Sequence, residues 1–229
     1  MNAESIKNKP VHIFDFDGVI VDSMPVKNRC YLDLFPETEP RRQSKIKEII
    51  DGCIGIPREV TMGKLIAVTL ADENDCKNDF QQSLSPESLN EISSHLVQVM
   101  CRTYSDSIQF NSRNIKLVDG LLKYLNSLEE KAMLFVLSSA PHDDVVAMAK
   151  EKGVFDIFDR VEGGASPKHE GITRIVNSVG VATQECVYYG DQHKDELSAL
   201  SANVVFVGIN KDSGVFKTSA SVKDFTEIL

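Results

Sequence analysis

The sequence lacks the features that would place it in several large classes of protein. Its five cysteines form no Cys-X-X-Cys pair, and their odd number and wide spacing predict reduced thiols rather than a disulfide framework. It has no run of Lys and Arg, and its formal charge of −9 argues against a nucleic-acid or anionic-membrane surface. No apolar run is long enough to span a bilayer, and the polar start MNAESIKNKP lacks the apolar segment of a signal peptide. We therefore expect a cytoplasmic protein that binds neither nucleic acid nor membrane.

What is present is the composition of a globular protein with a substantial core. The 229 residues are 42% apolar and 26% charged, which are ordinary values. Four short apolar runs are candidate strands, because each is too short for a helix and none alternates cleanly with polar residues. Strands that are buried on both faces of a parallel sheet have this pattern. The runs are VHIF (11–14), MLFVL (133–137), CVYY (186–189) and VVFVG (204–208).

The segments between the later runs have the period of a helix. Apolar residues recur at helical spacing within 118–128, 145–149 and 172–179. Gly153 and Gly180 are placed to end the last two of these helices. Strands and helices alternating in this order predict an α/β fold with a doubly wound, Rossmann-like parallel sheet and right-handed crossovers.

The stretch from about residue 24 to 110 breaks this alternation. It has no convincing strand, and helical patterns occupy 62–70 and the segment after Ser85-Pro86, where an N-cap serine precedes a proline at the first helical position. A helical insert placed directly after the first strand is typical of a lid. We predict that residues 1–23 and 111–229 form the α/β core and that 24–110 form an inserted α-helical cap domain.

Polar side chains gather where the predicted strands end. In open parallel sheets, ligands bind beyond the carboxyl ends of the strands, so the residues that follow each strand are the candidates for a site. Carboxylates follow the first and third runs, two serines follow the second, and a lysine stands between the second and third runs. These residues are Asp15, Asp17, Ser138, Ser139, Lys168, Asp191 and Asp195.

This set of side chains is suited to phosphoryl transfer. Crowded carboxylates need a counterion, and Mg²⁺ prefers hard oxygen ligands. A metal shields the charge of a phosphate so that an aspartate can attack it and form an acyl-phosphate. Lys168 and the hydroxyl of Ser138 would stabilise charge on the phosphoryl oxygens. A second carboxylate two residues along, Asp17, can protonate the leaving oxygen and later activate water.

Four segments resemble the four motifs of the haloacid dehalogenase-like hydrolase superfamily, in that family's order and spacing. They are DFDGVIVDS (15–23), FVLSS (135–139), SPKHEGI (166–172) and YYGDQHKDE (188–196). The insert between the first and second motifs is similar to that of the helical-cap subgroup, which includes phosphoglycolate phosphatase and beta-phosphoglucomutase. The resemblance implies a Mg²⁺-dependent phosphatase that acts on a small phosphorylated metabolite, as a monomer or a homodimer.

The resemblance also implies roles for individual residues. Asp15 would be the nucleophile and a metal ligand, and Asp17 would be the general acid/base and bind the metal through its backbone carbonyl. Asp191 would be a further metal ligand, and Asp195 would support the metal or its waters. The substrate would be bound by the second-motif residues Ser138 and Ser139, by the third-motif Lys168, and by Arg58 in the cap loop GCIGIPREV (52–60).

The sequence departs from the family in two places. Mutases of this type carry a cap-side histidine about ten residues after the acid/base aspartate, where this chain has Lys27. The third motif usually continues Lys-Pro-Asp-Pro, whereas here it continues from Lys168 as His-Glu-Gly. The first departure argues against a mutase, and the second weakens assignment to a named subfamily.

Other interpretations remain open at this stage. Ser138 can instead cap the following helix, and Arg58 can be an ordinary exposed arginine of the cap. The functional alternatives are a sugar-phosphate phosphomutase, a receiver-like signalling domain and a non-enzymatic phosphate-binding protein of the same fold. A receiver domain places its phosphoacceptor on a strand after the acidic pair, and this sequence has no spare strand-end aspartate between Asp17 and Ser138.

Overall fold

The computed structural model describes residues 3–36, 39–53, 56–70, 86–128, 132–165, 167–210, 214–216, 219 and 221–229. The chain divides into two compact units. The sheet unit comprises Met1–Met24 and Arg113–Leu229, and the helical unit comprises Pro25–Ser112. The assignment of residues 24–110 as a catalytic cap stays a prediction.

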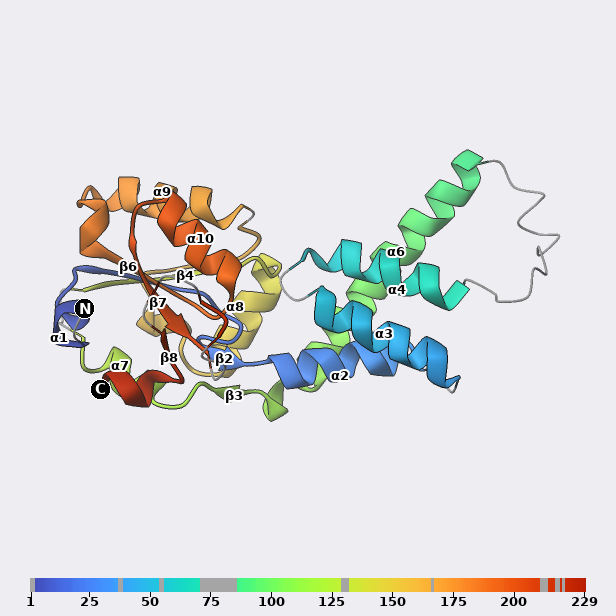
Figure 1. Ribbon diagram of the computed structural model, residues 1–229, viewed down its shortest axis with the longest axis horizontal. Coiled ribbons are helices and arrows are strands. Elements are labelled where there is room, and N and C mark those ends of the chain that lie inside the picture. Colours follow the sequence, from blue (N-terminus) through green and yellow to red (C-terminus); the bar gives the residue numbers. More distant parts are fainter. Residues whose placement is uncertain are drawn as a thin grey trace. The chain divides into compact units, whose positions relative to one another are not determined.

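The sheet unit is built on a six-stranded parallel sheet (Figure 1). The strands lie in the order β5-β4-β1-β6-β7-β8, and each pairs in parallel with its neighbour. Their bounds are β1 Val11–Phe14, β4 Met133–Leu137, β5 Arg160–Glu162, β6 Cys186–Gly190, β7 Val205–Ile209 and β8 Ser221–Val222. The chain runs outward in one direction from β1 and in the other from β6, so the topological switch point lies between these two neighbours.

Helices cover both faces of this sheet, so the predicted doubly wound α/β class is confirmed. On one face, α9 (Lys168–Val179) and α10 (His193–Ser201) pack on apolar side chains of β1, β4, β6 and β7. On the other face, Tyr124 of α7 (Leu121–Leu125) packs on Phe225 of the C-terminal 3-10 helix (Phe225–Ile228), with ring centroids 5.0 Å apart. In the described part of the unit, the remaining α-helices are α1 (Ala3–Lys7) and α8 (His142–Glu151).

The predicted helix ends are confirmed, whereas the first predicted helix is shorter than its apolar pattern. Gly180 ends α9 with φ +71°, and Gly153, with φ +68°, follows the end of α8. Within 118–128 only α7 is helical, because the chain turns again after Asn126. Apolar spacing alone does not show where a helix stops.

The helical unit contains α2 (Met24–Leu34), α3 (Pro40–Gly52), α4 (Arg58–Leu70) and α6 (Pro86–Phe110), so the predicted helical insert is confirmed. The chain leaves the sheet unit through β2 (Val21–Asp22) and returns through β3 (Lys116–Leu117), and these two strands pair antiparallel. The buried residues of α4 include Met62 and Leu65, as the pattern predicts. Ser85, the predicted N-cap of α6, lies outside the described residues. No helix in the described ranges is long and apolar enough to cross a membrane.

Candidate active site

The candidate site begins where β1 and β6 end side by side. The two strands are in parallel register with Phe14 opposite Tyr189, and the N–H of Asp15 donates to the carbonyl of Tyr189 at 2.8 Å. Asp15 and Asp191 are therefore the first residues beyond two adjacent strands. This edge is also the topological switch point, where open α/β sheets bind their ligands.

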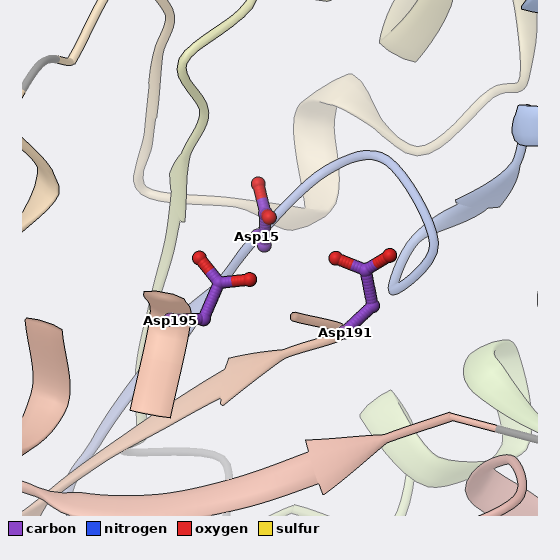
Figure 2. Close-up of side chains that lie close together, drawn as sticks. All are labelled: Asp15, Asp191 and Asp195. Carbon is purple, nitrogen blue, oxygen red and sulfur yellow. The ribbon is translucent and has the colours of Figure 1, made fainter. Parts of the chain in front are cut away.

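Three carboxylates converge at this edge (Figure 2). Asp195, from the first turn of α10, joins Asp15 and Asp191, and one oxygen of each lies within 4.8 Å of the others. All three side chains are buried, and Asp195 is completely inaccessible to solvent. Three buried negative charges this close repel one another unless cations or protons neutralise them.

Lys168 supplies one of the neutralising charges. It is the first residue of α9, and its Nζ forms an ion pair with Oδ2 of Asp15 and another, at 2.7 Å, with Oδ1 of Asp195. Burial by itself would lower the pKa of Lys168, but electrostatic interactions with the neighbouring Asp15, Tyr188 and Asp195 outweigh it and raise the pKa well above its ordinary value. Lys168 therefore stays charged at physiological pH.

The positive charge of one lysine does not balance the negative charges of three carboxylates. The pKa values of Asp15 and Asp191 show this imbalance. Burial raises the pKa of Asp15 to about 6, although the charge of Lys168 opposes this shift. Burial, reinforced by the charges of Asp15 and Asp195, raises the pKa of Asp191 to about 8. A divalent cation would relieve this imbalance, and clustered carboxylate oxygens are the ligands that Mg²⁺ prefers. The donor set therefore fits the predicted metal.

Asp17 lies in the turn that follows and is not one of the three clustered carboxylates. Its side chain is partly exposed, and its Oδ1 accepts a hydrogen bond of 2.5 Å from the hydroxyl of Ser23. Gly18 adopts φ +78°, and its N–H donates to the carbonyl of Val21 at 2.8 Å. A turn of this shape gives the neighbouring aspartates Asp15 and Asp17 different environments, one buried and one partly solvated.

The second-motif serines lie beyond β4, next to β5. The N–H of Ser138 donates to the carbonyl of Glu162 at 2.9 Å, and its buried Oγ accepts from the N–H of Ala140 at 3.1 Å. Ser138 thus closes a local turn, while Pro141 occupies the N-cap of α8, so the interpretation of Ser138 as that helix's cap is wrong. Ser139 is exposed and donates through Oγ to the carbonyl of Ala165 at 3.0 Å. Ser166, in the third motif, lies outside the described residues.

The two cap residues of interest lie in the helical unit. Arg58, at the start of α4, is partly buried, donates to the hydroxyl of Ser105 and lies 5.3 Å from the centroid of the Tyr104 ring. The hydroxyl of Tyr104 in turn donates to the carbonyl of Lys27 at 3.4 Å. Arg58 is therefore held in place within its unit. Ile54 and Gly55 of the same loop lie outside the described residues.

Several residues that support the site were not predicted from the sequence. The hydroxyl of Tyr188 donates to Asp195 at 3.2 Å, and the side-chain amide of Asn210 donates to the carbonyl of Asp191 at 2.7 Å. Gln192 donates through its backbone N–H to Asp195 at 3.0 Å and through its side chain to Asp191 at 2.9 Å. Tyr188 lies within the apolar run CVYY. Its own hydroxyl group is the only sign in the sequence that it has a polar partner.

The chain is similar to known proteins of one family. The family model described as haloacid dehalogenase-like hydrolase matches residues 12–209. A phosphoglycolate phosphatase from Colwellia psychrerythraea is 24% identical over 214 residues, which cover 89% of this chain and 85% of that protein. A predicted phosphoglycolate phosphatase from Haemophilus somnus is 19% identical, with a TM-score of 0.68 and coverage of 97% of this chain and 96% of that one. YfnB from Bacillus subtilis, solved with bound magnesium, is 15% identical, with a TM-score of 0.68 and coverage of 96% and 97%. The two structures share the fold of this chain.

Proposed function

Because the chain belongs to the haloacid dehalogenase-like hydrolase family, we propose that it is a Mg²⁺-dependent phosphatase that hydrolyses a small phosphomonoester through an aspartyl-phosphate intermediate. The observation that carries this proposal is the contact of Lys168 with both Asp15 and Asp195, beside the buried Asp191. A lysine and carboxylates at one strand edge provide a nucleophile and a partner for phosphoryl oxygens. The family assignment gives no support to the receiver-like alternative.

In the first half of the reaction, a carboxylate oxygen of Asp15 attacks the phosphorus. The bond from phosphorus to the ester oxygen breaks as the new bond forms, and Asp17 donates its proton to the departing alcohol. Lys168 and the hydroxyl of Ser138 stabilise the charge that develops on the equatorial phosphoryl oxygens, with Ser139 beside them. The alcohol leaves neutral, and the phosphoryl group remains on Asp15.

In the second half, water replaces the alcohol. The ionised carboxylate of Asp17 takes a proton from a water molecule, whose oxygen attacks phosphorus. The bond between phosphorus and Asp15 breaks, which releases inorganic phosphate and restores the Asp15 carboxylate. Asp17 ends the cycle protonated, as it began. The buried position of Asp15 limits the access of other water to this bond.

The residues that would hold the metal are Asp15 and Asp191 through their side chains and Asp17 through its backbone carbonyl, with Asp195 in support. A bound Mg²⁺ supplies charge neutralisation for the phosphate and its surrounding carboxylates. The raised pKa of Asp191, to about 8 through burial, supports this assignment, because a nearby cation favours the ionised form.

The substrate is proposed to be a small phosphorylated metabolite, with Arg58 as a contact from the helical unit. Phosphoglycolate is the first candidate, since the Colwellia psychrerythraea relative is a phosphoglycolate phosphatase.

The cysteines in the described part of the chain are free thiols at 30, 53, 101 and 186, which supports the proposed cytoplasmic location.

The test is a screen of phosphomonoesters, headed by phosphoglycolate, with Mg²⁺ and with EDTA. We expect Mg²⁺-dependent release of phosphate, a loss of at least about 1000-fold in Asp15→Asn, and near wild-type activity in Asp224→Asn. Asp224 is a matched control, because it is a buried aspartate that caps the C-terminal 3-10 helix. Full activity in Asp15→Asn would refute the mechanism, and no hydrolysis of any ester by the wild-type protein would refute the function.

The same screen separates a phosphatase from a phosphomutase. A mutase acting on beta-glucose 1-phosphate yields glucose 6-phosphate, whereas a phosphatase yields glucose and inorganic phosphate. Because Lys27 stands where mutases carry a histidine, we expect inorganic phosphate as the product.

A further inference from the structure

The hydroxyl of Tyr188 contacts one of the three clustered carboxylates, although its ring lies in the core. Tyr188, in β6, is completely buried and donates to Oδ1 of Asp195 at 3.2 Å. The same oxygen accepts from Nζ of Lys168 at 2.7 Å, and the other oxygen accepts from the N–H of Gln192 at 3.0 Å. A buried carboxylate needs such donors, and here each oxygen of Asp195 has at least one.

The ring of Tyr188 also lies next to the lysine. Nζ of Lys168 is 5.9 Å from its centroid, within the range over which an ammonium is attracted to an aromatic face. The centroid of Phe206 is 6.2 Å from that of Tyr188 on the core side. Tyr188 therefore contacts the Lys168–Asp195 pair in two ways, while packing fixes the position of its ring.

We propose that Tyr188 is a positioning residue that directs the ammonium group of Lys168. A lysine head on a flexible four-carbon stem can turn its three N–H donors, and its direction depends on its acceptors. Tyr188 holds Oδ1 of Asp195, which orients one donor, and Asp15 orients a second. The third is thereby directed to a phosphoryl oxygen. This role rests on the proposed phosphatase function, in which Lys168 stabilises the transition state.

A second buried tyrosine provides a matched control. Tyr124 is also completely buried, and its hydroxyl lies 2.6 Å from that of Tyr189, which in turn lies 2.8 Å from Nδ1 of His12. Tyr124→Phe and Tyr188→Phe each remove one hydroxyl from the core and keep the ring. Of the two tyrosines, Tyr188 contacts Asp195 and Tyr124 does not. A difference in kcat between the variants therefore reflects the position of the Tyr188 hydroxyl beside Asp195 rather than a loss of stability.

The first test compares the kinetics of the two variants on the best substrate of the screen. For Tyr188→Phe we expect kcat to fall about threefold to tenfold, the loss that one hydrogen bond supplies, with KM nearly unchanged. Tyr124→Phe should keep the wild-type kcat even where it lowers the melting temperature. Wild-type kcat in Tyr188→Phe, or an equal loss in both variants, would overturn the inference and leave the phosphatase proposal standing.

A double-variant test asks whether Tyr188 acts through Lys168. In a Lys168→Met background, Tyr188→Phe should cause no further loss of kcat, because the group it directs is absent. A purely structural role predicts instead that the two losses multiply. Independent effects of the two substitutions would therefore count against a positioning role.

A third test does not depend on activity. In protein carrying ¹⁵N-labelled lysine, the ammonium signal of Lys168 is identified by its disappearance in Lys168→Met. Tyr188→Phe should shift this signal and speed its hydrogen exchange, while Tyr124→Phe should leave it in place. An unmoved signal in Tyr188→Phe refutes the inference. If the wild-type protein hydrolyses no ester, the proposed function fails, and this measurement still decides whether Tyr188 orients Lys168.

Discussion

The hydroxyl of Ser23 donates a hydrogen bond of 2.5 Å to Oδ1 of Asp17. Ser23 is buried and directly follows β2, the strand through which the chain leaves the sheet unit, while Asp17 lies in the turn after β1. The bond closes the loop between these two segments and holds the carboxylate that we propose as the acid/base. The two residues belong to the same motif, so one short segment contains the group and its support.

Replacing Ser23 tests whether this support matters for catalysis. We expect Ser23→Ala to lower kcat about threefold to tenfold and stability by about 1 kcal/mol, because Asp17 loses an orienting hydrogen bond. Ser23→Thr, which keeps a hydroxyl, should retain most of the activity. Steady-state kinetics and urea unfolding measure the two effects. A loss of stability with an unchanged kcat would show that the bond supports only the fold.

Gly18 is predicted to tolerate no side chain, since its turn packs against Asp191. A Cβ built at Gly18 would lie 2.3 Å from Oδ2 of Asp191, and φ there is +78°. We expect Gly18→Ala to reduce activity at least about 100-fold and to weaken Mg²⁺ binding, because either Asp191 or the turn must move. Titration calorimetry with Mg²⁺ and kinetics measure both effects.

Gly153 separates this clash from backbone strain. It also has positive φ, +68°, but a Cβ there has nothing within 4 Å. Gly153→Ala should therefore cost about 1 kcal/mol of stability and leave kcat and Mg²⁺ affinity unchanged. Equal effects in both variants would mean that strain, rather than the contact with Asp191, explains the loss at Gly18.

In the metal-free protein, the contribution of Asp191 to stability is predicted to fall as the pH rises. Burial raises the pKa of Asp191 from 3.8 to about 8, so the folded chain holds a proton that the unfolded chain releases. The contribution of this group is fully present below pH 3.8 and is lost as the pH rises through about 8, at up to about 1.4 kcal/mol per pH unit. Mg²⁺ should stabilise the protein more at pH 8 than at pH 6.

Asp191→Asn provides the comparison, because it removes the titrating group. Thermal unfolding with EDTA at several pH values should show a smaller pH dependence in the variant than in the wild-type protein. Added Mg²⁺ should raise the melting temperature of the wild-type protein and have little effect on that of the variant. A wild-type slope retained in Asp191→Asn would assign the pH dependence to another group.

His12 is predicted to destabilise the protein at acidic pH. Its imidazole is buried between the hydroxyl of Tyr189 at Nδ1 and the carbonyl of Lys9 at Nε2, both at 2.8 Å, so the neutral ring donates through Nε2 and accepts at Nδ1. Burial lowers the pKa of His12 from 6.5 to about 4. As the pH drops, the unfolded chain therefore takes up a proton at this residue before the folded chain does, and the contribution of His12 to stability falls as the pH drops from 6.5 through about 4.

The contribution of His12 is isolated by comparing the pH dependence of stability in His12→Phe with that in the wild-type protein. The variant loses two hydrogen bonds at neutral pH, so we expect lower stability there, but the difference from the wild-type protein should shrink as the pH falls towards 4. Urea unfolding between pH 4.5 and 7 measures the difference. In the wild-type protein, nitrogen NMR of the ring should show a neutral imidazole with its proton on Nε2 down to about pH 5. A ring that is charged at pH 6 would contradict the assignment.

The central strands could be predicted from the sequence, whereas the edge strands could not. β1 and β4 match the predicted runs residue for residue, because both faces of these strands are buried and every position is apolar or packed. β5 contains Arg160-Val161-Glu162, and only Val161 is buried. β8 has two residues, Ser221 and Val222. Neither edge strand has a hydrophobic run long enough to be recognised.

The helical unit shows a similar limit. The apolar pattern correctly predicts the helix α6, yet Val99 is exposed, and the buried residues among the described side chains of this helix are Cys101, Tyr104 and Ile108. Helical period indicates that a helix forms. The neighbouring helices decide which part of its apolar face is buried. Their placement does not follow from the local sequence.

The sequence alone was enough to predict that carboxylates gather at the candidate site. Asp15 and Asp191 each directly follow a strand, and parallel strands in one sheet bring their carboxyl ends to one edge. The ionisation and the contacts of these carboxylates follow instead from the packing of the folded sheet unit. Burial sets the pKa values of Asp15 and Asp191, and contacts between distant segments pair Lys168 with Asp195 and Asp195 with Tyr188. The positions of the central strands along the chain follow from local pattern, but desolvation and side-chain contacts depend on the packing of the whole sheet unit.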